Sequence, residues 1–257
     1  MATEDLVRAF WLAGHHALVT GGGSGLGLAI ARCFVAAGAR VTIAGTRQAK
    51  LDAALDGLGP GAGAMAFDVT RTDRAEAFAA AVAERRGPVS VLVNNAGNTV
   101  KKPLADMEVD DFRAVMDVHV TGAYALTRAF LPQILAAEAG SILFTASMAS
   151  YLALPNIAGY TTAKTAILGL VRAFSAEVAG RGVRVNGVAP GWIDTDLFRQ
   201  ATATDPARRE RILARIPAGR LGTPEEVGWA MAYLASPAAA YVNAQVLAVD
   251  GGALSAF

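Results

Sequence analysis

The feature that most constrains the fold is a glycine-rich loop between a short strand and a helix. Residues 17–20 are mainly apolar and predict a buried strand, and an apolar helical pattern follows the loop. The loop itself contains Gly21, Gly25 and Gly27, in the spacing G-x-x-x-G-x-G. Glycine allows a tight turn and a close approach to a pyrophosphate, which the positive end of the helix attracts. This context favours a dinucleotide site over an ordinary strand-to-helix turn.

Strand and helix patterns alternate along the whole chain. After the first strand, further strands are expected at residues 40–44, 64–68, 89–93, 141–146, 183–189 and 245–249. Helices are expected between them, including two long ones at Val109–Leu135 and Tyr160–Gly180. Such alternation predicts one α/β domain over residues 1–257, built on a doubly wound parallel sheet. Residues 192–222 have no clean periodicity, which favours a mobile lid or substrate loop there.

Composition limits the classes of function. A chain of 257 residues with a net charge of +1 gives no reason to expect nucleic acid or an anionic membrane as a partner. The single cysteine, Cys33, excludes an internal disulfide framework and favours a reducing compartment such as the cytoplasm. The first 14 residues carry Glu4, Asp5 and Arg8 and do not resemble a signal peptide, and no apolar run is long enough to span a membrane. We therefore expect a cytoplasmic enzyme or binding domain without a metal site.

Polar residues at the ends of the predicted strands indicate where a cofactor binds. In dinucleotide folds an acid after the second strand binds the ribose 2′-hydroxyl, whereas an arginine accommodates a 2′-phosphate. Here Thr46 and Arg47 occupy this place, which favours NADP and leaves NAD possible. In the alternative, Arg47 is a solvated surface residue. Asp68 and Asn94 come at the ends of later strands and belong to the same edge of the sheet.

A tyrosine and a lysine four residues apart provide a candidate proton carrier. Tyr160 and Lys164 lie one turn apart on the same helix face, and Ser147 is expected at the end of the fifth strand. A positive charge about 4 Å from the phenol, at an effective dielectric constant of roughly 20, shifts its pKa by about three units. Tyr160 could then exchange protons with an alcohol or a carbonyl. Taken alone, this spacing is also common in helices where the tyrosine only packs.

Several motifs occur together and in order. They are Thr20-Gly21-x-x-x-Gly25-x-Gly27, Asp68-Val69, Asn94-Asn95-Ala96-Gly97, Ser147, Tyr160-x-x-x-Lys164 and Pro190-Gly191. Together they resemble the short-chain dehydrogenase/reductase family over nearly the whole chain. The resemblance implies a Rossmann fold with seven parallel strands, a nicotinamide cofactor and hydride transfer between an alcohol and a ketone. It also implies a homodimer or homotetramer assembled through the two long helices.

The resemblance assigns roles to individual residues. Tyr160 would be the general acid/base, Ser147 would orient the substrate oxygen, and Lys164 would bind the nicotinamide ribose and lower the pKa of Tyr160. Thr195 would contact the nicotinamide carboxamide. The cofactor contacts expected in full are Gly21, Gly23, Ser24, Gly25, Leu26, Gly27, Thr46, Arg47, Asp68, Val69, Asn95, Ala96, Gly97, Tyr160, Lys164, Pro190, Gly191, Ile193 and Thr195.

One position departs from the family pattern. Members usually have an asparagine on the first long helix that anchors a proton-relay water, and His119 takes its place here. An imidazole can also hydrogen-bond a water and titrates near neutral pH, so His119 is a candidate fourth catalytic residue. In the alternative, His119 only packs in the helix.

The substrate is less constrained than the reaction. The segments Lys101-Lys102-Pro103-Leu104 and 220–226 resemble members of a gluconate 5-dehydrogenase-like subgroup, which implies a sugar acid or polyol. Lys101 and Lys102 would attract an anionic substrate, unless they are only a solvated surface pair. A 3-oxoacyl-carrier-protein reductase is a second hypothesis, and a non-catalytic NADP-binding regulator is a third. The direction of the reaction stays open at this level.

Overall fold

The computed structural model describes residues 3–203 and 205–256, and in this part seven strands form one parallel sheet. The strand order is β3-β2-β1-β4-β5-β6-β7. The strands are β1 (His16–Thr20), β2 (Arg40–Gly45), β3 (Ala62–Ala66), β4 (Val91–Asn94), β5 (Gly140–Thr145), β6 (Val183–Pro190) and β7 (Val246–Val249). The order reverses direction between β1 and β4, so a crevice is expected at their carboxyl ends. The predicted doubly wound sheet is confirmed.

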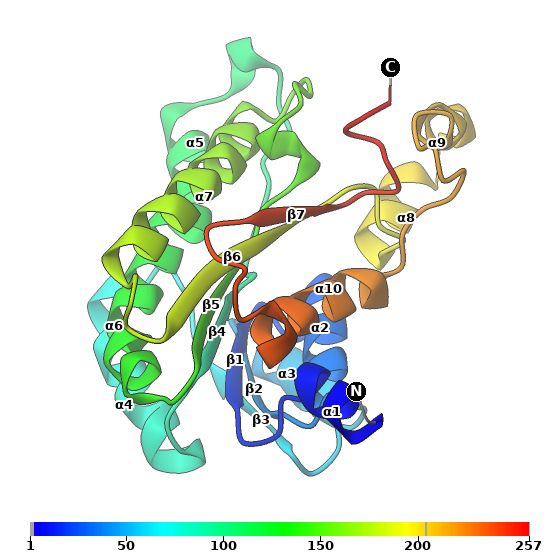
Figure 1. Cartoon of the computed structure of the whole chain (residues 1–257). Helices are drawn as coiled ribbons and strands as arrows, with labels where there is room; N and C mark the ends of the chain where they lie inside the picture. The colour runs from blue at the N-terminus through cyan, green and yellow to red at the C-terminus, as the bar shows by residue number, and fades with distance from the viewer. Residues whose placement is uncertain (1–2, 204, 257) are drawn as a thin grey trace.

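Helices cover both faces of the sheet (Figure 1). One face packs against α2 (Gly25–Ala36), α3 (Gln48–Leu55) and α10 (Pro224–Ala235). The other packs against α4 (Ala75–Arg86), α6 (Gly122–Ala136) and α7 (Ala158–Glu177). Because both faces are covered, β1 is buried along its whole length, which explains its continuous apolar run. None of the described helices has the length and apolar character needed to cross a membrane.

The first long helical region is not one regular helix. It consists of α5 (Val109–Met116), a π-helical turn η3 (Asp117–Thr121) and α6. At the start of α6 the backbone passes so close to the loop after β3 that a Cβ on Gly122 would lie 2.7 Å from the Val69 carbonyl. This close packing is a tertiary feature that periodicity does not report. The π-helical turn carries His119.

Several boundaries differ by one to three residues from the sequence-based expectation, and one helix was not expected. β3 ends at Ala66, two residues before the expected end, because the chain turns at Asp68, whose carboxylate accepts a hydrogen bond from the Thr70 amide at 2.9 Å. The helix α1 (Thr3–Phe10) was not expected. It packs on the body of the protein through Phe10, whose ring lies 6.2 Å from that of Tyr233.

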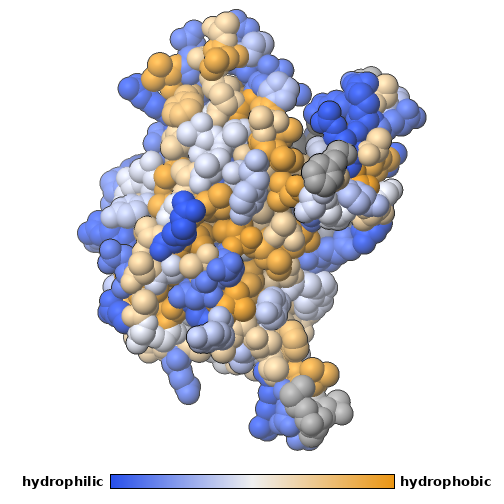
Figure 2. Space-filling model, turned by 45° about the horizontal axis from the view of Figure 1, so that its top comes forward, coloured by the Kyte–Doolittle hydropathy of each residue, from blue (hydrophilic) through white to orange (hydrophobic). Residues whose placement is uncertain are grey.

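The predicted loop at residues 192–222 contains two short helices, α8 (Asp196–Thr202) and α9 (Pro206–Leu213). Its base is closed by a bridge between Ile193 and Gly222, where the Asp194 amide donates to the Gly222 carbonyl at 2.8 Å. Above this base, α8 and α9 project from the body of the protein (Figure 1). Figure 2 shows apolar surface between this projection and the rest of the same face. The segment is therefore a structured flap whose two ends are fastened together.

Candidate active site

The glycine-rich loop has the shape of a phosphate cradle. Gly21 and Gly25 adopt positive φ angles of +65° and +54°, which are costly for other residues. A Cβ on Gly27 would lie 2.6 Å from the side-chain nitrogen of Asn95, so this position also requires glycine. The helix α2 begins at Gly25, and the Ser24 side chain makes no capping hydrogen bond. The backbone N–H groups of the first turn can therefore donate to an anion, which fits a bound pyrophosphate.

Thr20 and Asn95 join the ends of three strands. The Thr20 hydroxyl accepts hydrogen bonds from the backbone amides of Asn95 and Ala96 at 2.9 and 3.0 Å. The Asn95 side chain donates to the Thr20 carbonyl at 2.9 Å and accepts from the Thr145 hydroxyl at 3.1 Å. β1, β4 and β5 are thus tied together where they reach the cofactor edge. This network holds the segment 95–97 against the glycine-rich loop.

The residues predicted to contact the adenosine half lie at the same edge. Thr46 and Arg47 are exposed directly after β2. Val69 is buried, whereas the Asp68 carboxylate turns back to the Thr70 amide and hydroxyl. The segment directly after β2 carries an arginine and no acid. The predicted contacts Gly23, Ser24 and Leu26 lie in the loop or in the first turn of α2.

The residues predicted to contact the nicotinamide half lie after β6. The Gly191 amide donates to the Val249 carbonyl of β7 at 3.0 Å, and β6 extends through Pro190. Ile193 is buried in the base of the flap. Thr195 begins α8, where its hydroxyl accepts a hydrogen bond from the Phe198 amide at 3.2 Å. These residues therefore link the sheet edge to the flap.

Ser147, Tyr160 and Lys164 come together beside this edge. Ser147 follows β5 and is 9% exposed, and Tyr160 lies in the first turn of α7. Lys164 is 4% exposed, and its Nζ donates to the Thr145 carbonyl at 2.6 Å. The Ser150 hydroxyl donates to the Lys164 carbonyl at 2.7 Å and fastens α7 to the loop after β5. The structure therefore brings these three side chains together at one edge of the sheet.

The electrostatics of this group differ from the expectation in one respect. Burial lowers the pKa of Lys164 to about 7. Burial also raises the pKa of Tyr160, and the hydrogen bond with Ser147 only partly opposes this rise. The pKa of Tyr160 is thus raised by burial, where lowering by Lys164 was expected; the Lys164 ammonium is bonded to the Thr145 carbonyl.

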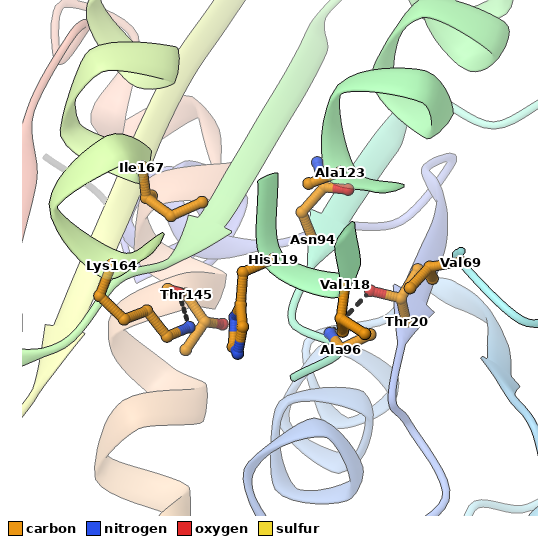
Figure 3. A pocket seen from close by; sticks show the side chains of 10 residues that line it. All are labelled: Thr20, Val69, Asn94, Ala96, Val118, His119, Ala123, Thr145, Lys164 and Ile167. Carbon is orange, nitrogen blue, oxygen red and sulfur yellow. Dashed lines mark hydrogen bonds between the residues drawn. The ribbon is translucent and has the colours of Figure 1, made fainter. Parts of the chain in front are cut away.

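A small cavity of about 10 Å³ lies beside Lys164 and Thr145, which is room for about one water molecule. Its lining comes from β1, β4, β5, the π-helical turn and α7 (Figure 3). Figure 3 shows the side chains of Lys164 and His119 reaching the same space beside Thr145. The cavity is lined by Thr20, Val69, Asn94, Ala96, Val118, His119, Ala123, Thr145, Lys164 and Ile167.

His119 lies inside the site. The side chain is 3% exposed, and its ring packs edge-on against the Tyr160 ring with the centroids 5.5 Å apart. Its Nε2 lies 2.8 Å from the Asn98 carbonyl oxygen and 3.1 Å from the Asn98 amide nitrogen. Burial and, to a lesser degree, the charge of Lys164 lower the pKa of His119 to about 3. The imidazole is therefore uncharged at neutral pH.

Lys101 and Lys102 differ in their surroundings. The Lys102 ammonium forms an ion pair with Asp111 at 2.6 Å, and the Lys102 amide donates to the Asn156 carbonyl at 2.9 Å. Lys101 is exposed. Of the expected pair, then, Lys102 is bound to a carboxylate of the protein itself.

A groove of about 440 Å³ lies between α8 and α9. In this groove Arg199 forms an ion pair with Asp194 at 2.9 Å.

Two contributors to the site were missed by the sequence analysis. Thr145 supplies the carbonyl that holds Lys164, and Asn98 supplies the backbone that holds His119. Thr145 stands two residues before Ser147 at a strand end, which could have indicated it. Asn98 acts through its backbone, so its residue type carries no signal.

Known proteins match this chain over nearly its whole length. A family model described as Enoyl-(Acyl carrier protein) reductase matches residues 21–253. The chain is 43% identical over 253 residues to galactitol 2-dehydrogenase (L-tagatose-forming) of Cereibacter sphaeroides, covering 96% of this chain and 98% of that protein. It is 38% identical over 241 residues to the 3-oxoacyl-acyl-carrier-protein reductase of Vibrio cholerae serotype O1, covering 94% and 98%. The solved structure of a gluconate 5-dehydrogenase from Burkholderia cenocepacia J2315, in complex with NADP and tartrate, has a TM-score of 0.93 at 35% identity and covers 98% of this chain and 100% of that chain.

Proposed function

The chain belongs to the short-chain dehydrogenase/reductase family, whose members are NAD(P)-dependent oxidoreductases of CH–OH groups, and we propose that it interconverts a secondary alcohol and a ketone on a sugar acid or polyol. The observation that carries this proposal is the meeting of Ser147, Tyr160 and Lys164 at the carboxyl edge of the sheet, beside a glycine-rich loop at a helix N-terminus. These are the groups that a proton transfer coupled to hydride transfer requires.

In this mechanism the protein handles the proton. When bound, the nicotinamide accepts or supplies the hydride. The Ser147 hydroxyl holds the substrate oxygen, and Tyr160 takes the alcohol proton in oxidation or returns it in reduction. Lys164 is held by the Thr145 carbonyl and keeps two further N–H donors for the ribose and the phenol side of the site. His119 is the proposed fourth member of the site, where its ring lies against Tyr160 and stays uncharged because its pKa is far below neutral; it does not itself carry the proton.

NADP is the proposed preferred cofactor. The exposed Thr46 and Arg47 follow β2 and can receive a 2′-phosphate, since no acid stands at this place. The glycine-rich loop with Ser24 and Leu26, the segments 68–69 and 95–97, and the residues Pro190, Gly191, Ile193 and Thr195 complete the proposed contacts. The gluconate 5-dehydrogenase structure with NADP supports this preference.

A polyol or sugar acid is the proposed substrate class. The relatives named galactitol 2-dehydrogenase and gluconate 5-dehydrogenase support it. The exposed Lys101 adds a positive charge to the loop that follows the carboxyl end of β4. Reduction of a 3-oxoacyl-carrier-protein is the second candidate, supported by the 38% identity to such a reductase.

The proposal covers the whole chain as one domain, with the flap at 192–222 as its substrate loop. A cytoplasmic homotetramer or homodimer is proposed. Exposed apolar residues support assembly: Tyr124 on α6 is 50% exposed and lies next to Phe174 on α7, and Leu247 on the edge strand β7 is 42% exposed. Sedimentation of the purified protein tests the number of subunits. The free, buried Cys33 is compatible with a reducing compartment.

A substrate panel tests the proposed function. Sugar acids, polyols and a 3-oxoacyl thioester would each be tried with NADP(H) and NAD(H), with turnover followed by the nicotinamide absorbance. We expect the highest kcat/KM for a sugar acid or polyol with NADP(H). A preference for the thioester would support the second candidate. Tight NADP(H) binding without turnover on any substrate would indicate a non-catalytic binding protein instead.

A further inference from the structure

The π-helical turn places His119 between two parts of the active site. On one side is the backbone of Gly97 and Asn98, which continues the segment 95–97 at the end of β4. On the other is the ring of Tyr160, at a centroid distance of 5.5 Å. A single imidazole therefore contacts the cofactor-binding segment and the proton carrier at once.

The bond to Asn98 exists in both neutral forms of the ring. When Nε2 carries the proton, it donates to the Asn98 carbonyl at 2.8 Å. When the proton is on Nδ1, Nε2 accepts from the Asn98 amide at 3.1 Å. In either tautomer Nε2 is engaged by the backbone. A proton relay through an imidazole needs both nitrogens, one to receive a proton and one to release it, and here one nitrogen is already occupied.

The surrounding backbone is shaped to this ring. A Cβ on Gly97 would lie 2.5 Å from Cε1 of His119, so only glycine leaves room for the imidazole. The Asn98 side chain donates to the Ala114 carbonyl of α5 at 3.2 Å, which fastens the same turn a second time. The loop 97–102 is joined to α5 once more by the ion pair between Lys102 and Asp111.

We infer that His119 is a positioning residue, whose uncharged imidazole fixes the Gly97–Asn98 turn to Tyr160 through Nε2 and through ring packing. The inference rests on the proposed function for its effect on turnover, but the connection itself is a property of the folded chain. The low pKa of His119 agrees, because a ring that stays neutral can hold hydrogen bonds without changing its charge during the reaction. His119 thereby differs in role from a residue that carries the proton.

Two substitutions separate this role from the others. In His119→Gln the terminal amide lies at about the position of Nε2. Its nitrogen can donate to the Asn98 carbonyl and its oxygen can accept from the Asn98 amide, but it carries no proton in a relay. In His119→Leu the volume is roughly kept and both nitrogens are lost. For each variant the experiment measures hydrogen exchange of the Asn98 amide in the cofactor-free protein, and kcat and KM for cofactor and substrate.

We expect His119→Gln to keep the exchange protection and most of the activity. His119→Leu should speed exchange of the Asn98 amide about tenfold and lower kcat/KM by a similar factor, since one buried hydrogen bond is lost. Thr121→Ala is the matched control, because Thr121 is exposed on the same π-helical turn and should change neither readout.

Two results would overturn the inference. If Gln and Leu lower kcat equally while Asn98 stays protected in both, the ring is a proton carrier. If His119→Leu keeps both protection and activity, His119 only fills space. Should the native enzyme turn over no substrate, the proposed function fails, and the exchange comparison alone still decides whether His119 holds the turn.

Discussion

The ammonium of Lys164 lies over the ring of Tyr160 and is bonded to the backbone of β5. Its Nζ lies 5.6 Å from the ring centroid and donates to the Thr145 carbonyl at 2.6 Å. Burial lowers the pKa of this ammonium to about 7 and raises the pKa of the phenol. Only below about pH 7 is Lys164 charged while Tyr160 is neutral. This is the state in which Tyr160 can donate a proton to a ketone.

This relationship predicts the pH dependence of reduction. We expect kcat/KM for the ketone to fall as the pH rises through about 7, because Lys164 loses its charge there. Rates measured from about pH 5.5 to 9 at saturating NADPH test this. The variant Lys164→Gln should be slow and should lack this inflection. A flat native profile over this range would show that Lys164 does not titrate in the working enzyme.

The second prediction concerns cofactor choice. Arg47→Ala should raise KM for NADP roughly tenfold or more and leave KM for NAD nearly unchanged, because a charge-assisted contact to the 2′-phosphate is lost. Arg85→Ala, which removes an exposed arginine near the end of α4, is the control. Equal changes for both cofactors would count against a 2′-phosphate site at Arg47.

The third prediction concerns acid stability. Burial lowers the pKa of His15, His16 and His119 below the value of 6.5 that they have when unfolded. The ring of His16 is buried, its Nδ1 faces the Gly87 carbonyl at 2.9 Å and its Nε2 faces the Thr42 hydroxyl at 2.8 Å. The stability from neutral histidines is fully present above pH 6.5 and is lost as the pH falls below it.

From pH 7.5 to about 5.5, the free energy of unfolding should fall by about 1.4 kcal/mol on account of His119, and further on account of His16. Urea unfolding at several pH values measures this. His16→Gln should be less stable at pH 7.5 but should lose less on acidification. If its slope with pH equals that of the native protein, His16 does not contribute to the acid sensitivity.

The fourth prediction separates the two neighbouring lysines. Lys101→Ala should raise KM for a sugar acid at low salt and spare a neutral polyol, because an exposed positive charge attracts anions and is screened by salt. Lys102→Ala should instead loosen the loop, because it breaks the ion pair with Asp111. The measurement is the ratio of KM for the sugar acid to KM for the polyol, at low and at high ionic strength. If Lys101→Ala leaves this ratio unchanged, the charge of Lys101 does not attract the substrate.

Much of the fold could be predicted because its determinants are local. Apolar runs bounded by glycine and polar turns marked the strands, and the spacing of Tyr160 and Lys164 marked one helix face. The start of helix α9 also has local signals in the sequence: Pro206 stands at its first turn, and the Asp205 side chain caps it by accepting from the Arg208 amide at 2.8 Å. These short helices lack an apolar periodicity, which is why the segment was expected to be irregular.

The remaining features depend on contacts distant in sequence. The π-helical turn forms where Gly122 meets the Val69 carbonyl, and no pattern in residues 109–135 reports that contact. The same is true of Lys164 and His119, whose partners are backbone groups of β5 and of the loop after β4. Their pKa values follow from burial, which residue types and spacing do not determine.

The most direct test of the central claim compares the native enzyme with Tyr160→Phe on the best substrate of the panel. This substitution keeps the ring that packs against His119 and removes the oxygen that carries the proton. The account predicts that kcat falls by about 10²–10⁴-fold or more while the dissociation constant for NADPH stays within a small factor of the native value. A variant that binds NADPH and retains near-native kcat would show that Tyr160 is not the acid/base, and would contradict the account.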